Sequence, residues 1–256
     1  MTTAEISIWR IADLVAETQA GGVKLQVDLR RPAGGLTATG ISPVRENARL
    51  LGVVLGESSE ECQQPADYFQ RQRDLVVTYA ATAARPMRVQ VYWRRVPDNT
   101  AGVRPATVLA AAELQVSVQT DAMDIVPRVL TLSQFRIANR TQPWLESNAF
   151  LPPGGADENQ LLSLSRPGGG CLMHCSLASD RHYVEMVHPE DYQETQCHVA
   201  SDGSLRISHQ LLAGRLEKGV IVRARVRGLL LRGPIDGERL AGAFATFTSA
   251  APPLTV

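Results

Sequence analysis

Hydrophobic and polar residues alternate along much of this chain with a period of two, the pattern of a β-strand that buries one face. In residues 23–30, apolar side chains at every second position alternate with charged or amide side chains. Residues 87–94 and 113–119 repeat this pattern. Further strands, separated by turn-forming Gly, Pro, Asn and Asp residues, are expected near residues 5–17, 49–56, 74–81, 129–135, 160–166, 171–178, 182–188, 204–212 and 219–231.

One segment has helical spacing instead. Leu240, Phe244 and Phe247 recur on one face of a helix, Asp236 is placed to cap its N-terminus, and the proline pair at 252–253 stops it. The sequence therefore predicts an all-β fold of antiparallel, supersandwich-like sheets with one short C-terminal helix near residues 237–249. Parallel sheets would need helices between their strands.

At 256 residues and 44% hydrophobic content, the chain is long enough to bury one large core. We expect a single β domain over residues 1–256, with an N-terminal lobe of about residues 1–140 and a C-terminal lobe of about residues 160–256. Residues 142–170 are rich in Pro and Gly and predict a long loop between the lobes. A loop of this length can form the wall of a pocket.

Composition narrows the possible partners. The net charge is zero, so the long-range field that attracts nucleic acid or an anionic membrane is missing, and neither is expected as a partner. Neither a signal peptide nor an apolar run of about 18 residues is found, which predicts a soluble cytoplasmic protein. The sequence also lacks GxSxG, P-loop, strand-associated GxGxxG and HExxH motifs. We therefore exclude the enzyme classes built on them and expect no cofactor.

Residues suited to near-neutral proton transfer or metal binding are concentrated between positions 171 and 209, which hold all five histidines and three of the four cysteines. A zinc site would need His174, Cys197 and His198 to converge from neighbouring strands. Because no CxxC pair is present, we expect no metal, and we expect the cysteines to be reduced and to pack as small apolar residues.

Residues 182–192 form the densest group of usable side chains. As a strand, this segment places Glu185 on the face opposite His188. Glu185 lies between apolar neighbours, and is either an exposed polar residue or a buried general base with a raised pKa. Its histidine partner must come from another strand, such as His174 or His209, or from a bulge that turns His188 around. The candidate catalytic residues are Glu185, His188 and His174.

Two polar stripes complete the candidate site. Residues 223–227 place three arginines on one strand face about 7 Å apart, and residues 88–94 place two arginines beside an aromatic ring. Guanidinium groups bind carboxylates or sugar hydroxyls, and an aromatic ring among hydrogen-bonding groups suits a sugar. The alternative is that the stripes form cross-strand ion pairs or a solvated face. The candidate substrate-binding residues are Arg88, Tyr92, Arg94, Arg223, Arg225 and Arg227.

Two parts of the sequence resemble an uncharacterised all-β family of planctomycete bacteria: DLVVTY at 74–79 with RVQVYWR at 88–94, and YVEMVHP at 183–189 with LEKGVI at 216–221. The chain is also similar in length and strand number to the galactose-mutarotase-like supersandwich, which often handles carbohydrates. The resemblance implies a bacterial protein with large antiparallel sheets. Mutarotases use a glutamate base and a histidine acid, but their catalytic motif is absent around Glu185, so the resemblance assigns no catalytic residue.

Two functions are compatible with these patterns. The first is a protein that binds a carbohydrate or isomerises it as a mutarotase does, which predicts a pocket with converging polar groups. The second is a non-catalytic structural or protein-interaction β-sandwich, which predicts a filled interior and dispersed polar residues. The sequence leaves open the ligand, whether the protein is an enzyme, and its oligomeric state.

Overall fold

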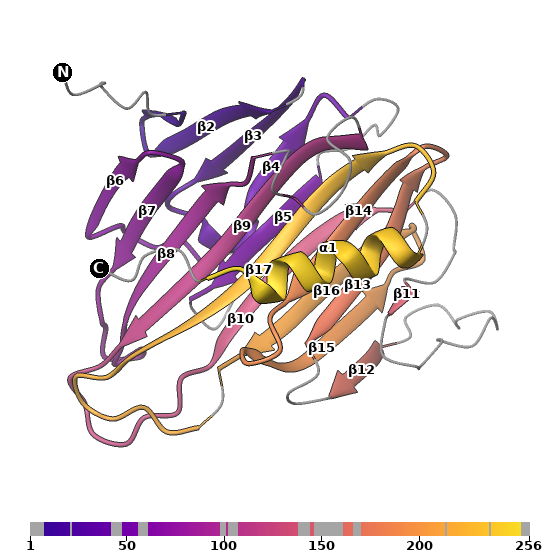
Figure 1. Cartoon of the computed structure of the whole chain (residues 1–256). Helices are drawn as coiled ribbons and strands as arrows, with labels where there is room; N and C mark the ends of the chain where they lie inside the picture. The colour runs from indigo at the N-terminus through magenta and orange to yellow at the C-terminus, as the bar shows by residue number, and fades with distance from the viewer. Residues whose placement is uncertain are drawn as a thin grey trace.

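The computed structural model describes residues 8–20, 22–41, 48–55, 61–97, 101, 107–137, 144–145, 161–165, 170–212, 214–235 and 237–251. Within these residues the strands form two antiparallel sheets that pack face to face (Figure 1). The predicted all-β architecture is confirmed. Each sheet takes strands from both halves of the chain.

Nine described strands form the first sheet. In spatial order they are β1 (Arg10–Ala12), β2 (Val15–Ala20), β3 (Val23–Asp28), β4 (Leu36–Thr39), β5 (Ala48–Val54), β10 (Val129–Arg136), β16 (Ser204–Leu211), β15 (Tyr192–Val199) and β12 (Leu161–Ser165). Pro32–Gly34 forms a short 3-10 helix between β3 and β4.

Eight described strands form the second sheet. In spatial order they are β11 (Trp144–Leu145), β13 (Cys171–Ala178), β14 (Arg181–Val187), β17 (Ile221–Arg232), β9 (Val108–Gln119), β8 (Arg88–Arg95), β7 (Asp74–Tyr79) and β6 (Asp67–Arg71).

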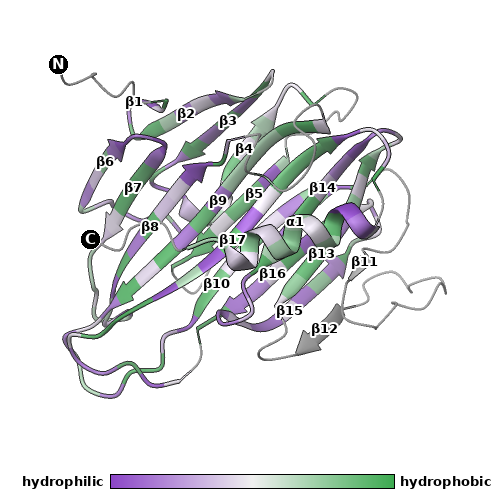
Figure 2. Ribbon diagram, in the orientation of Figure 1, coloured by the Kyte–Doolittle hydropathy of each residue, from purple (hydrophilic) through white to green (hydrophobic). Residues whose placement is uncertain are grey.

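The main core lies between the sheets. Alternate residues of strands such as β8, β9 and β17 point into it, as the hydropathy bands along these strands show (Figure 2). On β8, for example, Val89, Val91 and Trp93 are fully buried. Arg88, Gln90, Tyr92 and Arg94 of β8 therefore face outward, on the side of the eight-stranded sheet that is turned away from the nine-stranded one.

The helix covers part of this outer face. Helix α1 (Gly237–Ser249) spans the predicted residues and buries Leu240, Ala243 and Phe247 against apolar side chains of β13, β14 and β17 (Figure 1). Asp236, the predicted cap, lies outside the described residues. A second apolar cluster thus forms outside the main core, and the polar outer face of β7 and β8 lies beside it.

Two further predictions concern the N-terminal strand and the loop in the middle of the chain. The expected strand near 5–17 is instead a hairpin, because the chain turns at Asp13 and Leu14, both of which adopt positive φ angles. The predicted loop at 142–170 lies largely outside the described residues, and its described parts are the strands β11 and β12 and the residue Gly170. Among the described residues, no helix is long and apolar enough to cross a bilayer.

Candidate functional site

The two predicted polar stripes lie on the same face. Strand β9 pairs with β8 on one side and with β17 on the other, and directly paired residues point to the same side of a sheet. Tyr92 is opposite Gln115, which is opposite Arg225, and Gln90 is opposite Ser117, which is opposite Arg223. The outer face therefore carries a grid of polar side chains across three neighbouring strands.

A row of alternating charge crosses this grid. From β6 to β17 the paired residues are Arg71, Asp74, Arg94, Glu113 and Arg227. Arg94 donates two hydrogen bonds to Asp74, at 2.6 and 2.8 Å, and Arg227 donates two to one oxygen of Glu113, at 3.0 and 2.7 Å. Two predicted substrate-binding arginines thus bind carboxylates of their own sheet, the ion-pair arrangement considered as the alternative.

The next two rows carry groups suited to hydroxyl-bearing ligands, and we call Thr78, Gln90, Tyr92, Gln115 and Ser117 the polar face. Tyr92 donates a hydrogen bond to Gln90, whose amide in turn donates to Thr78 at 3.1 Å. Gln115 is buried, and neither its amide nitrogen nor its amide oxygen has a hydrogen-bond partner among the described residues. A buried amide without hydrogen bonds lowers the stability of the fold unless a ligand or a water molecule supplies the missing partners.

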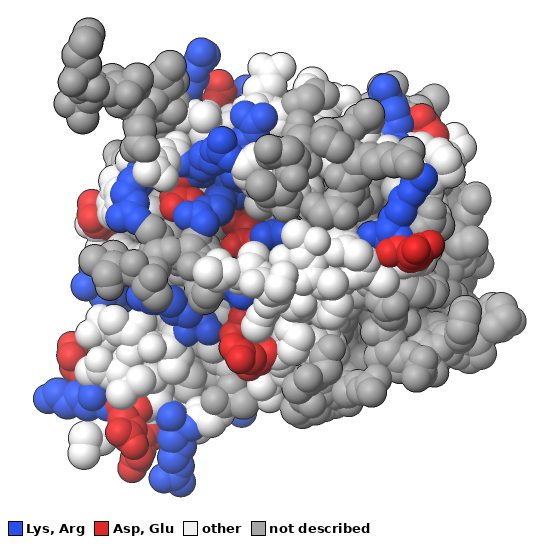
Figure 3. Space-filling view, viewed as in Figure 1, with Lys and Arg blue, Asp and Glu red and all other residues white. Residues whose placement is uncertain are grey.

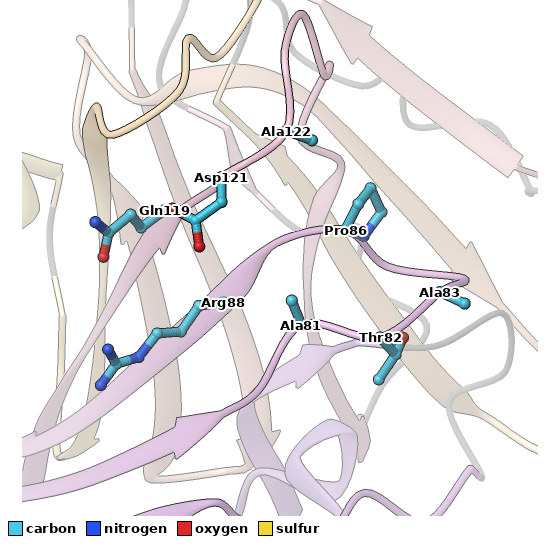
Figure 4. A pocket seen from close by; sticks show the side chains of 8 residues that line it. All are labelled: Ala81, Thr82, Ala83, Pro86, Arg88, Gln119, Asp121 and Ala122. Carbon is cyan, nitrogen blue, oxygen red and sulfur yellow. The ribbon is translucent and has the colours of Figure 1, made fainter.

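A pocket of about 510 Å³ adjoins the polar face where β7, β8 and β9 end. In Figure 4, Arg88 and Gln119 lie on one side and Pro86, Ala83 and Thr82 on the other. Arg88 and Gln119 are directly paired across β8 and β9, which fixes their relative positions. We call this the Arg88 pocket; its remaining lining residues are Ala81, Asp121 and Ala122.

Glu185, the predicted general base, is enclosed between the two sheets with 1% of its surface exposed. His209 of β16, the fully buried histidine of the opposite sheet, places Nε2 at 2.7 Å from one carboxylate oxygen, and its Nδ1 is 2.7 Å from the hydroxyl of Thr195. Ser133 and Tyr183 donate to the other carboxylate oxygen, Ser133 at 2.5 Å. A neutral imidazole with its proton on Nε2 satisfies both of its contacts.

We call Glu185, His209, Thr195, Ser133 and Tyr183 the interior network. Every member is buried, and its members come from both sheets. Burial, followed by the nearby Glu185 carboxylate, raises the pKa of Tyr183 well above its usual value. A ligand on the outer face cannot touch these groups. Glu185 instead links the two sheets through its hydrogen bonds to His209 and Ser133.

Local backbone geometry depends on the same network. A bulge in β5 puts Leu51 at a φ of 56°, and its N–H donates to the Ser133 hydroxyl at 3.0 Å. Gly228 lies opposite Glu185 on β17, and a Cβ at that position would be 2.8 Å from the Tyr183 hydroxyl. The glycine is therefore required for the tyrosine to reach the carboxylate.

His188 and Arg225 hold the end of α1. The His188 Nε2 lies 3.2 Å from the carbonyl of Thr248 and its Nδ1 accepts a hydrogen bond from the backbone N–H of Glu190 at 3.3 Å. Arg225 donates to the carbonyl of Ala250 at 3.1 Å. Cationic and N–H donors favour a helix C-terminus because its last carbonyls lack partners within the helix.

We expect Arg225→Met to loosen this helix end. The variant loses the bond to Ala250 and the contact of the guanidinium with the Phe247 ring, whose centroid is 5.4 Å away. We expect the free energy of unfolding to fall by about 1–2 kcal/mol. Hydrogen exchange of residues 247–250 should accelerate, whereas Arg223→Met, on the same strand face but exposed, should change it much less. Equal protection in both variants would contradict this role.

His174 lies on the outer face with His182, and their Nε2 and Nδ1 atoms are 3.1 Å apart. Burial, followed by the neighbouring His182, lowers the pKa of His174 to about 4. Cys197 instead faces the core, where its sulfur contacts that of Met173 at 3.6 Å. His174, Cys197 and His198 therefore do not converge, and the described residues contain no group of three potential metal ligands.

Several residues of the candidate site could not be singled out from the sequence. Gln119 and Asp121 reach the Arg88 pocket because β9 runs beside β8, and Glu113 and Gln115 belong to the grid for the same reason. Their own alternation with apolar residues was the available signal. It predicts a polar face on β9, but the pattern within one strand does not say which strand lies beside it.

Comparison with known proteins supports the fold. No protein-family model and no curated protein sequence matches the chain. A crystal structure of a "putative aldose 1-epimerase" from Klebsiella pneumoniae matches with a TM-score of 0.59 and 8% identity, over 92% of this chain and 84% of that one. This likeness shows an aldose 1-epimerase-like sandwich architecture, in agreement with the mutarotase-like resemblance.

Two longer proteins match less well. A "putative kojibiose phosphorylase" from the human microbiome has a TM-score of 0.39 at 8% identity, over 94% of this chain and 36% of that protein. A polysaccharide lyase has a TM-score of 0.37 at 10% identity, over 91% of this chain and 34% of the lyase. This chain therefore spans about a third of the length of either protein.

Proposed function

We propose that the protein binds a carbohydrate in the Arg88 pocket, beside the polar face. The Arg88 pocket carries this proposal, because its volume of about 510 Å³ is that of a small-ligand site and it presents a guanidinium, a carboxamide and a carboxylate together. Such groups donate to and accept from the paired hydroxyls of a sugar. The nearby Tyr92 ring offers the apolar surface on which a sugar ring can pack.

The geometry favours binding over sugar isomerisation. A mutarotase-like reaction needs an acid and a base at the sugar ring, and hydrogen-bond reach is the first requirement for both. Glu185 and His209 are buried in the core, and the described residues that line the Arg88 pocket include no histidine. The structural match to a putative aldose 1-epimerase supports a sugar ligand through the shared architecture. It does not support epimerisation, because Glu185 and His209 cannot reach a bound sugar.

The test is saturation-transfer NMR against a panel of aldoses. We expect binding by the wild type, and about tenfold weaker binding by Gln119→Ala, which removes one amide from the Arg88 pocket. The matched control is Gln210→Ala, because Gln210 lies on β16 of the other sheet. The rate of anomer exchange should equal the spontaneous rate. A sugar panel without any binder would refute the proposal, and accelerated exchange would refute its non-catalytic part.

A further inference from the structure

Strand β6 is one edge of the eight-stranded sheet. It pairs with β7 over all five of its residues without a register shift, and no other described strand pairs with it. Every residue of β6 is exposed, and Tyr68 and Phe69 are each 43% exposed. The strand contains neither proline nor lysine, residues that commonly keep an exposed edge from pairing with another chain. β6 therefore has the character of an edge that accepts a further strand.

Alternate residues of β6 share the outer face of the sheet. Phe69 is opposite Val76, which is opposite Tyr92, and directly paired residues point to the same side. Tyr92 faces outward, so Phe69 does as well. Asp67 and Arg71, two residues away on either side, point the same way. The outer face of the edge thus carries an acid, an aromatic ring and a base in that order.

The charged row of the outer face ends at Arg71. Its neighbour in the row, Asp74, already accepts two hydrogen bonds from Arg94, at 2.6 and 2.8 Å. Among the described residues, no ion pair involves Asp67 or Arg71. Figure 3, which views the outer face, shows acidic and basic side chains beside one another on this side of the molecule. A carboxylate on the far side of Arg71 would continue the alternation of charge.

A second copy of the chain supplies such a carboxylate. Two copies related by a two-fold axis perpendicular to the sheet would pair their β6 strands antiparallel. Because directly paired residues point to the same side, the residue opposite Phe69 must be Asp67, Phe69 or Arg71 of the second copy. Only the pairing of Phe69 with Phe69 uses all five residues of β6. It also places Asp67 of each copy opposite Arg71 of the other, so the charged row continues across the axis.

We propose that the protein forms a homodimer through antiparallel pairing of β6 with β6 of a second copy. Backbone hydrogen bonds between the two edges, two pairs of opposite charge and the contact between the two Phe69 rings stabilise it. The contact is isologous, so it closes at two copies. Because only five residues of each chain pair, the dimer is weak, with a dissociation constant on the order of 10–100 µM.

Sedimentation velocity of charge-reversal variants tests this dimer. The wild type should convert from monomer to dimer as its concentration rises. Asp67→Arg and Arg71→Asp each set like charges opposite one another at both pairs, and each should weaken dimerisation about tenfold or more. The double variant Asp67→Arg, Arg71→Asp exchanges the two charges and should dimerise like the wild type. The control is Arg206→Glu, at an exposed position on β16 of the other sheet, and should leave the dimer unchanged.

A disulfide across the two-fold axis tests the register. Residues directly opposite one another in an antiparallel pair have Cα atoms about 4.5–5.5 Å apart, within the range that a disulfide spans. Phe69→Cys should therefore form a covalent dimer under oxidising conditions, in a Cys62→Ser background because Cys62 is an exposed thiol. Gln196→Cys in the same background, at an exposed position on β15, is the control and should remain monomeric.

Three results would overturn the proposal. A wild-type chain that stays monomeric up to about 1 mM, well above the expected dissociation constant, would exclude the dimer. A dimer that persists unchanged in both Asp67→Arg and Arg71→Asp would form through another surface. A folded double variant that fails to regain dimerisation, or a Phe69→Cys chain that forms no disulfide although it dimerises, would exclude the pairing of Phe69 with Phe69.

Discussion

Glu185→Ala is expected to destabilise the folded state by about 3–5 kcal/mol, the cost of leaving buried polar partners without their acceptor. The substitution removes both carboxylate oxygens of the interior network. His209, Ser133 and Tyr183 then keep buried donors that water cannot reach. Urea unfolding followed by circular dichroism should show the loss as a lower midpoint.

Glu185→Gln is the informative companion variant. Its amide oxygen can still accept from Ser133 and Tyr183, and its amide nitrogen can donate to His209 if the imidazole proton moves to Nδ1. We therefore expect a smaller loss than for alanine. Glu217→Ala, at an exposed position in a loop, is the control and should lie within about 0.5 kcal/mol of the wild type. A fully stable Glu185→Ala protein that no longer binds sugar would show that the carboxylate belongs to a functional site instead.

The second large effect concerns the ion pair between Arg227 and Glu113, whose side chains are 7% and 3% exposed. Arg227→Met should lower the free energy of unfolding by about 3–5 kcal/mol, because the buried Glu113 carboxylate loses its cationic partner. The guanidinium also lies 4.7 Å from the centroid of the Phe247 ring, so the same variant weakens the packing of α1 on the sheet. Thermal and urea unfolding measure both consequences.

A double-mutant cycle separates the ion pair from simple packing. Glu113→Leu combined with Arg227→Met removes both charges, and this double variant should be considerably more stable than the sum of the single losses predicts. The control is the exposed pair of Arg136 and Asp202, with 48% and 55% exposed side chains, where Arg136→Met should cost less than about 1 kcal/mol. Additive losses at Arg227 and Glu113 would contradict a coupled buried pair.

Much of the sheet architecture could be predicted because many strands bury one face and expose the other, as β3 and β8 do. The alternation in residues 23–30 and 87–94 corresponds to β3 and β8, and helical spacing predicted the span of α1. Strand β15 was not predicted. Its pairing with β16 shifts register between Tyr192 and Glu194, and Thr195 and not an apolar residue points inward after the shift. A bulge followed by a buried polar side chain removes the alternation on which the prediction depends.

The candidate site was accessible from the sequence only in part. Alternation separated Glu185 from His188, and His209 was one of the two histidines from other strands considered as the partner of Glu185. The alternation could not show that the strand face carrying Glu185 is the interior of the sandwich. A buried polar network and an exposed polar row both place polar side chains at every second residue. Arg225 was singled out by its charge, yet its bond to Ala250 depends on where α1 returns across the sheet. Such contacts between distant segments are set by strand order.

The central position of β17 has a consequence for the synthesis of this protein. It is the last described strand in the chain, yet it lies between β14 and β9, and roughly a hundred residues separate Gln119 from its partner Ile221. At about 5–20 residues per second, a ribosome needs about 5–20 s to supply that partner. During this interval the long edge of β9 has no neighbour on one side, and unpaired edges of this kind promote aggregation. The nascent chain therefore depends on protection of β9 until β17 arrives to close the sheet.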